Sequence, residues 1–177
     1  MVRNAGAAVV AAAVGLAMGC GSHGEPWTGG LVVGRGPLGP ESKAPNTIGS
    51  SCPDGAAGYF HIDESSDAIA VRAYDLAAGL KAGASVRIEV KIWATASFPT
   101  DQLDVFVADD AKAPVWTLLR TLTPTRAGAQ VLAVDHVLGT GSLQAVRAQL
   151  RHAGSLAGGC SAGEFDDRDD LAFAVAR

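Results

Sequence analysis

The chain has 177 residues, a formal net charge of −4 at pH 7 and an apolar fraction of 48%. Its basic residues are spread along the sequence and form no basic stripe, which argues against nucleic acid or an anionic lipid surface as a partner. Aromatic residues make up only 6%, so small aliphatic side chains should fill the core of a single ordinary domain.

Residues 1–19 have the layout of a signal peptide. Arg3 is followed by an apolar run of about 14 residues, which is shorter than the roughly 20 residues that a membrane-spanning helix needs. We therefore predict export of the chain and no transmembrane anchor.

Cys20 follows this run and is the odd member of three cysteines. The segment Leu16–Cys20 (LAMGC) resembles the lipobox of bacterial lipoproteins, with the leucine one place further from the cysteine than is usual. We expect lipidation of Cys20 and a membrane anchor, with the outer membrane favoured because Gly21 is not the aspartate that marks retention at the inner membrane. The alternative is cleavage by the ordinary signal peptidase, which would leave Cys20 as a free thiol.

Residues 20–51 are rich in Gly, Pro, Ser and Thr and have no apolar periodicity, which predicts a flexible tether. Leu31–Val33 could pass for a strand before Gly34–Gly39 (GRGPLG), which has the letters of a dinucleotide-binding fingerprint, but Pro37 and Pro40 exclude the helix that such a site needs. We expect residues 52–177 to form the folded domain.

Beyond Cys52, short alternating segments are separated by Gly, Pro, Asp and Thr, which is typical of antiparallel sheets. The clearest segment is 86–92, where Val and Ile alternate with Arg, Glu and Lys and so predict one core face and one solvated face. Further strands are expected at residues 69–73, 103–107, 115–122, 129–138, 146–150 and 171–175. This pattern predicts an all-β fold, an antiparallel two-sheet β-sandwich with jelly-roll wiring as one option.

Cys52 and Cys160 lie near the two ends of the expected strands, and two thiols in an exported domain usually pair. A disulfide that closes a loop of about 108 residues is worth roughly 4.7 kcal/mol on the chain-entropy account. The alternative is two unrelated thiols.

Three stretches carry a resemblance to a known module: Tyr59–Ser65, Trp116–Gln130, and Gly141–Ala148 together with Asp166–Leu171. They are similar to a β-sandwich module found at the C-terminal end of some secreted bacterial peptidases and in stand-alone myxobacterial lipoproteins. The resemblance implies an accessory role in binding or stabilisation, without identifying a ligand. That family's pattern often has histidine where Arg168 stands.

Two acidic clusters suggest a metal site, one near each cysteine of the expected disulfide. Carboxylates that repel one another are relieved by a hard dication with several oxygen ligands, and calcium is the natural candidate. We expect a structural role for such an ion, and the alternative is a solvated acidic loop. The members of the clusters are Asp63, Glu64 and Asp67, and Glu164, Asp166, Asp167, Asp169 and Asp170.

No catalytic motif is present, since HExxH, CxxC and GxSxG are all missing and His61, His136 and His152 are isolated in sequence. Trp93 and Trp116 could offer a platform to a polysaccharide, although core packing is the favoured interpretation. We therefore predict an exported, lipid-anchored, noncatalytic module of the cell envelope that binds a polysaccharide or an envelope protein. A hydrolase and a purely structural lipoprotein are the alternatives.

Overall fold

The computed structural model describes residues 31–34, 47–48, 52, 61–152, 158–160, 163 and 165–177. The predicted signal peptide, the predicted lipidation site Cys20 and the acidic residue Glu164 lie outside the described residues. Within the described part of the chain, no helix has the length and apolar character needed to cross a membrane.

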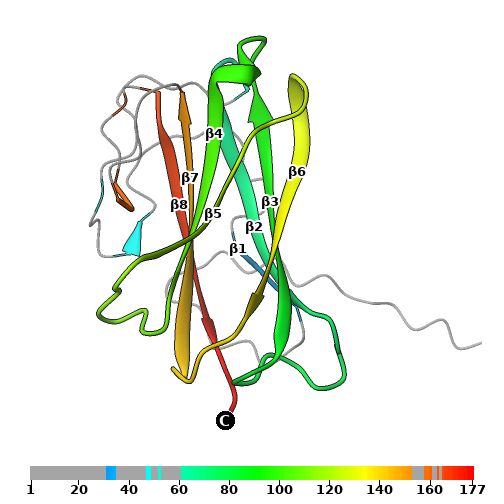
Figure 1. The fold of residues 1–177 in the computed structure, drawn as a ribbon, viewed down its shortest axis with the longest axis vertical. Helices are drawn as coiled ribbons and strands as arrows, with labels where there is room; N and C mark the ends of the chain where they lie inside the picture. Colours follow the sequence, from blue (N-terminus) through cyan, green and yellow to red (C-terminus); the bar gives the residue numbers. More distant parts are fainter. Residues whose placement is uncertain are drawn as a thin grey trace, which may run out of the picture.

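Two antiparallel sheets of four strands each form the domain (Figure 1). Sheet A has the strand order β1-β2-β3-β6, and these strands span Leu31–Gly34, Ser65–Ala73, Ser85–Ala94 and Gly128–Val137. Sheet B has the order β5-β4-β7-β8, and its strands span Thr117–Leu122, Asp101–Ala108, Leu143–His152 and Asp167–Ala174. A short 3-10 turn, Phe98–Thr100, leads from β3 into β4. The predicted all-β, two-sheet sandwich is confirmed.

The core lies between the two sheets and is built from the small aliphatic residues that the composition predicts. Strand β3 alternates as expected, with Val86, Ile88, Val90 and Ile92 at most 1% exposed. These residues pack in one cluster with apolar residues of sheet B, among them Val105, Val146, Ala148 and Leu150. Because an apolar residue at every second position suits a sheet with one buried face, the strand prediction is accurate here.

Part of the segment predicted to be a tether belongs to the domain. Leu31–Gly34 forms edge strand β1, which pairs with β2 through Val32 opposite Val71 and Gly34 opposite Ile69. Thr47 is buried, and its hydroxyl donates to the carbonyl of Cys52 at 3.0 Å. The tether prediction therefore does not hold at these positions, and most of segment 20–51 lies outside the described residues.

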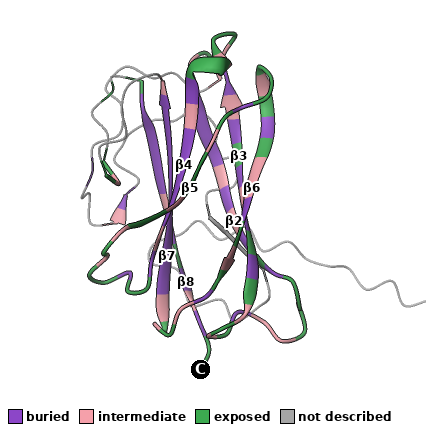
Figure 2. Ribbon diagram, viewed as in Figure 1, coloured by how far each residue is buried: buried purple, intermediate pink, exposed green. Residues whose placement is uncertain are grey.

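The two sheets differ in how their outer faces meet solvent (Figure 2). In β3 of sheet A, Arg87 and Lys91 are exposed as the alternation predicts. In β7 of sheet B, every residue from 144 to 151 is buried, including Arg147 and Arg151. Arg147 and Arg151 alternate with the apolar residues of this strand, which by the rule used for segment 86–92 would place them in solvent. They are buried because the outer face of sheet B is covered by other parts of the chain.

Candidate functional site

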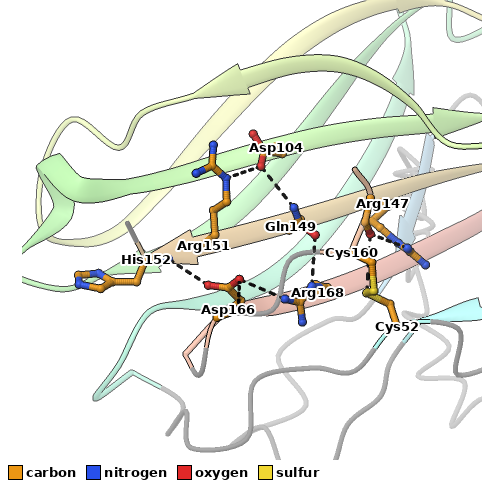
Figure 3. A network of polar contacts seen from close by, with 11 residues as sticks. Cys52, Asp104, Arg147, Gln149, Arg151, His152, Cys160, Asp166 and Arg168 are labelled. Atoms are coloured by element: carbon orange, nitrogen blue, oxygen red, sulfur yellow. Dashed lines mark hydrogen bonds and ion pairs between the residues drawn. A yellow bond between two sulfur atoms is a disulfide. The ribbon is translucent and has the colours of Figure 1, made fainter. Parts of the chain in front are cut away.

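Residues 47–48, 52 and 158–160 lie over the outer face of sheet B, and we call them the cover. They include a disulfide between Cys52 and Cys160, which confirms the predicted pair. Their Cα atoms are 5.7 Å apart, and the two cysteines are separated by 108 residues in sequence. The bridge joins a segment that precedes β2 to one that precedes β8. Figure 3 shows the two sulfur atoms beside the buried polar side chains of sheet B.

Arg147 and Asp170 form the ion pair nearest to this disulfide. Their strands β7 and β8 are neighbours, and the two residues lie opposite each other in the register. The guanidinium donates through Nε and Nη2 to the two carboxylate oxygens at 2.7 and 2.8 Å. Nη1 of Arg147 also donates to the carbonyl of Gly159 at 2.7 Å, and Asp170 accepts from the amide of Ile48 at 2.7 Å. The pair thus binds the main chain on both sides of the disulfide.

A second group of buried polar residues continues along the same face (Figure 3). Asp104 accepts from Nε of Arg151 at 2.7 Å and lies next to the amide of Gln149 at 3.4 Å. Gln149 accepts from Nε of Arg168 at 3.2 Å, and Arg168 donates to Asp166 at 3.1 Å. Buried charges require such partners, so these side chains stabilise a specific arrangement of the cover.

These contacts give a structural role to the position where the resembled family often has histidine. Arg168 is 1% exposed and connects Gln149 to Asp166. The larger guanidinium spans both partners, since it offers several donors in one plane.

The first acidic cluster places Asp67 between three donors. His61 contacts its carboxylate at 3.1 Å, the Ser65 hydroxyl donates to it at 3.0 Å, and Nζ of Lys91 lies at 3.5 Å. The ring of His61 also stacks on Trp93, with ring centroids 4.5 Å apart. Asp67 is therefore neutralised by protein groups and is 6% exposed.

The two tryptophans discussed for the sequence lie outside the core cluster. Trp93 stacks with His61, and Trp116 lies under the guanidinium of Arg147, 4.3 Å from its ring centroid. Core packing was therefore the wrong interpretation for both rings, since Trp93 lies on the outer face of β3 and Trp116, which directly precedes β5, packs against Arg147. Each ring is also engaged by a neighbouring side chain, so neither forms a bare aromatic platform.

A different grouping of donor atoms unites three strands at one end of the sandwich. It consists of Glu64, which directly precedes β2, Asp101 at the start of β4 and His152 at the end of β7. Nδ1 of His152 lies 2.8 Å from Oδ1 of Asp101 and 3.9 Å from Oε1 of Glu64. The carboxylates belong to residues that are 0% and 5% exposed, whereas the imidazole is 36% exposed.

The electrostatics of this group follow from its burial. Burial raises the pKa of Glu64, and the nearby Asp101 charge adds to the increase. The hydrogen bond to Asp101 raises the pKa of His152, since it stabilises the imidazolium. Both shifts favour the protonated forms of Glu64 and His152.

The structure distributes the other residues predicted to bind calcium among separate partners. Asp170 pairs with Arg147, and Asp166 accepts from Arg168 and from the amides of His152 and Gly163. Asp167 accepts from the amide of Ser66 in the opposite sheet, and Asp169 is buried in β8. Asp63 is half-buried next to Glu64. Among the described residues, only Glu64 of the predicted ligands belongs to the three-residue group.

Sequence reasoning missed Asp101, because this residue is isolated from both acidic clusters in the chain. His152 was considered and assigned no role. The pairing of strands β4 and β7 could have identified both residues, because it places Asp101 opposite His152.

Compared with known proteins, the chain matches no family model, and a search of curated proteins finds no significant match.

Proposed function

We propose that this chain is an exported, lipid-anchored module of the cell envelope that binds another envelope protein and performs no catalysis itself. The Cys52–Cys160 disulfide supports export, since such bonds persist in oxidising compartments. The signal-like residues 1–19 and the lipobox-like segment ending at Cys20 support the anchor. The similarity to accessory β-sandwich modules agrees with this role.

The order of contacts in Ser65, Asp67 and His61 argues against a serine hydrolase site at this place, which supports the noncatalytic proposal. These are the residue types of a serine hydrolase triad, in which histidine must lie between serine and aspartate to remove the serine proton. Here Asp67 is the central residue and accepts from Ser65 at 3.0 Å while it contacts His61 at 3.1 Å. This arrangement immobilises the serine hydroxyl and does not activate it.

The solvated outer face of sheet A is the surface that we assign to the partner. Val131 and Val137 on β6 are 58% and 57% exposed. Between them, Asp135 contacts Arg87 at 3.3 Å and accepts from the hydroxyl of Tyr74. A mixture of exposed aliphatic and charged side chains suits a protein partner. A glycan would favour bare aromatic rings, but Trp93 and Trp116 are both stacked against other side chains.

Export and anchoring are tested in cells by labelling with a fatty-acid analogue and by fractionation. We expect the wild-type chain to carry the label and to sediment with membranes, and the Cys20→Ala variant to lose both properties. An unlabelled wild-type chain in the soluble fraction would contradict the lipid anchor.

Binding is tested by placing a photo-crosslinking amino acid at Val131 in the full chain in its native envelope. The matched control is Val115, which is 81% exposed and precedes β5 of the other sheet. We expect one discrete protein adduct from position 131 and none from position 115. Equal adducts at both positions would contradict a specific surface, and retention of the full chain on insoluble cell-wall polysaccharide would favour the carbohydrate alternative.

A further inference from the structure

We propose that Glu64, Asp101 and His152 bind a divalent metal ion of the zinc type, which ties the two sheets together at one end of the sandwich. The site is independent of the protein-binding face proposed above. It also differs from the calcium site expected from the sequence, since it includes a nitrogen donor and only one of the acidic residues named there.

The positions of the donor atoms suit a single ion. One ligand atom from each residue lies within 4.8 Å of the others. The two separations from Nδ1 of His152 are 2.8 Å to Asp101 and 3.9 Å to Glu64. Zinc bonds of about 2.1 Å place two tetrahedral ligands roughly 3.4 Å apart, which lies between these values. Small movements of side chains would therefore complete three bonds.

A second observation points to a missing ligand. Glu64 is 5% exposed, and its Oε1 is buried without a hydrogen-bond partner. Asp101 is 0% exposed, and its Oδ2 is also buried without a hydrogen-bond partner. A buried carboxylate oxygen without a hydrogen bond is costly, and two carboxylates in one group repel each other. A dication beside them would remove both penalties.

The chemistry of the three donors selects the class of ion. Calcium takes six to eight ligands that are all oxygen, and magnesium retains an octahedral shell of oxygen atoms. Imidazole suits zinc and neighbouring transition metals, which commonly bind histidine together with carboxylates. His152 is 36% exposed, so an ion could enter past its ring and keep water as a further ligand. The net charge of two carboxylates and a neutral imidazole is matched by a dication.

The origin of the donors gives the site a structural consequence. Glu64 belongs to the entry of β2 in sheet A, whereas Asp101 and His152 belong to β4 and β7 of sheet B. A bound ion would therefore cross-link the sheets, in the same sense as the hydrogen bond from the Ser66 amide to Asp167. We expect the metal to stabilise the folded state because an unfolded chain does not hold these donors together.

The test uses the full chain, freed of metal by a chelator and then titrated with Zn²⁺, Co²⁺ or Ca²⁺. We compare wild type with Glu64→Gln, Asp101→Asn and His152→Gln, and use His61→Gln as the matched control. His61 contacts Asp67 and lies outside the three-residue group. Cys20 is common to all variants and cannot cause a difference among them. The readouts are metal stoichiometry, visible absorption of bound Co²⁺ and the thermal unfolding midpoint.

We expect wild type and His61→Gln to bind one Zn²⁺ and to unfold at a higher temperature when it is present. The three site variants should bind at least about tenfold more weakly, since even outer-shell substitutions cost about 10- to 100-fold. Metal-free Glu64→Gln should be as stable as wild type or more so, because it loses a repelling charge. This result separates lost binding from lost folding.

Two results would overturn the proposal. One is the absence of Zn²⁺ and Co²⁺ binding by wild type, or equal binding by wild type and Glu64→Gln. The other is a stabilisation by Ca²⁺ that Zn²⁺ does not reproduce, which would return the site to the calcium alternative.

Discussion

Arg147 and Asp170 form a bidentate ion pair between neighbouring strands, with hydrogen bonds of 2.7 and 2.8 Å. Their side chains are 2% and 1% exposed. The same two side chains hold the carbonyl of Gly159 and the amide of Ile48. Gly159 adjoins Cys160, and Ile48 lies four residues before Cys52. The ion pair and the disulfide therefore secure the same cover over sheet B.

The first prediction concerns this pair. Arg147→Met should lower the free energy of unfolding by about 3–5 kcal/mol, because it leaves the Asp170 carboxylate buried without its main counter-charge. Arg147→Lys should cost less, since it keeps the charge and loses the bidentate geometry. Urea unfolding measures both.

The control for the first prediction is the double variant Arg147→Met with Asp170→Leu. Apolar replacement of both members should recover much of the loss, because no unpaired charge remains. A cost below about 1 kcal/mol for Arg147→Met alone would show that water reaches the carboxylate, contrary to its burial.

The second prediction concerns the disulfide. Cys52→Ala with Cys160→Ala should destabilise the domain by at most about 4.7 kcal/mol, which is the chain-entropy value for so long a loop. In that background, Arg147→Met should cost less than in the oxidised protein, because both features hold the same segments. A double-mutant cycle from urea unfolding measures this coupling. If the changes in unfolding free energy were strictly additive, the cover would stay in place without the disulfide.

Strand β3 of sheet A could be predicted from the sequence because it has one core face and one solvated face. The stretch 86–92 shows this directly, since its valines and isoleucines are buried and its Arg87 and Lys91 are exposed. The same rule failed for Arg147 and Arg151, which alternate correctly and are nevertheless buried. Alternation tells which residues share a face, but whether that face meets solvent depends on distant segments that cover it.

The candidate metal group was only partly predictable for the same reason. Glu64 was noticed because it lies in an acidic cluster, and clustering in sequence is a local signal. Asp101 and His152 meet through strand pairing across 51 residues, so no local pattern includes both. The disulfide was predictable because three cysteines, together with the export predicted from residues 1–19, leave few pairings.

The third prediction concerns pH and His136 on β6. Burial lowers the pKa of His136, and the charge of Asp109 opposes this effect without cancelling it. Its Nε2 is buried without a hydrogen-bond partner. The unfolded chain therefore binds a proton at a pH where the folded chain does not. This contribution to stability is present above the unfolded pKa, near 6.5, and decreases as the pH falls.

We expect His136→Gln to lose less stability than wild type when the pH is lowered from about 7.5 to about 5.5, a range that brackets the ordinary histidine pKa. The difference in unfolding free energy between the two proteins, measured by urea at each pH, isolates His136 from the other histidines. Asp109→Asn should steepen the loss, because it removes the charge that favours the imidazolium. Parallel pH profiles for wild type and His136→Gln would contradict this assignment.

The fourth prediction concerns two glycines that follow β6 and pack against Asp109. A Cβ atom on Gly139 would overlap the Asp109 carboxylate, whereas one on Gly141 would overlap its backbone carbonyl oxygen. The loop has little freedom to move, since the amide of the buried Gln144 donates to the carbonyls of Gly139 and Gly141 at 2.9 and 3.0 Å. Alanine at either position should therefore cost about 1–3 kcal/mol through overpacking.

The two alanine variants should differ in whether a second substitution at Asp109 restores their stability. Asp109→Ala removes the side chain that a residue at 139 would strike, so it should restore much of the stability of Gly139→Ala. It leaves the backbone carbonyl in place, so Gly141→Ala should gain nothing from it. Urea unfolding at about pH 8, where His136 is neutral in both states, keeps the effect of Asp109 on that imidazole out of the comparison. Equal rescue of both variants would mean that the loop moves as a unit, because only a backbone shift relieves the contact at Gly141.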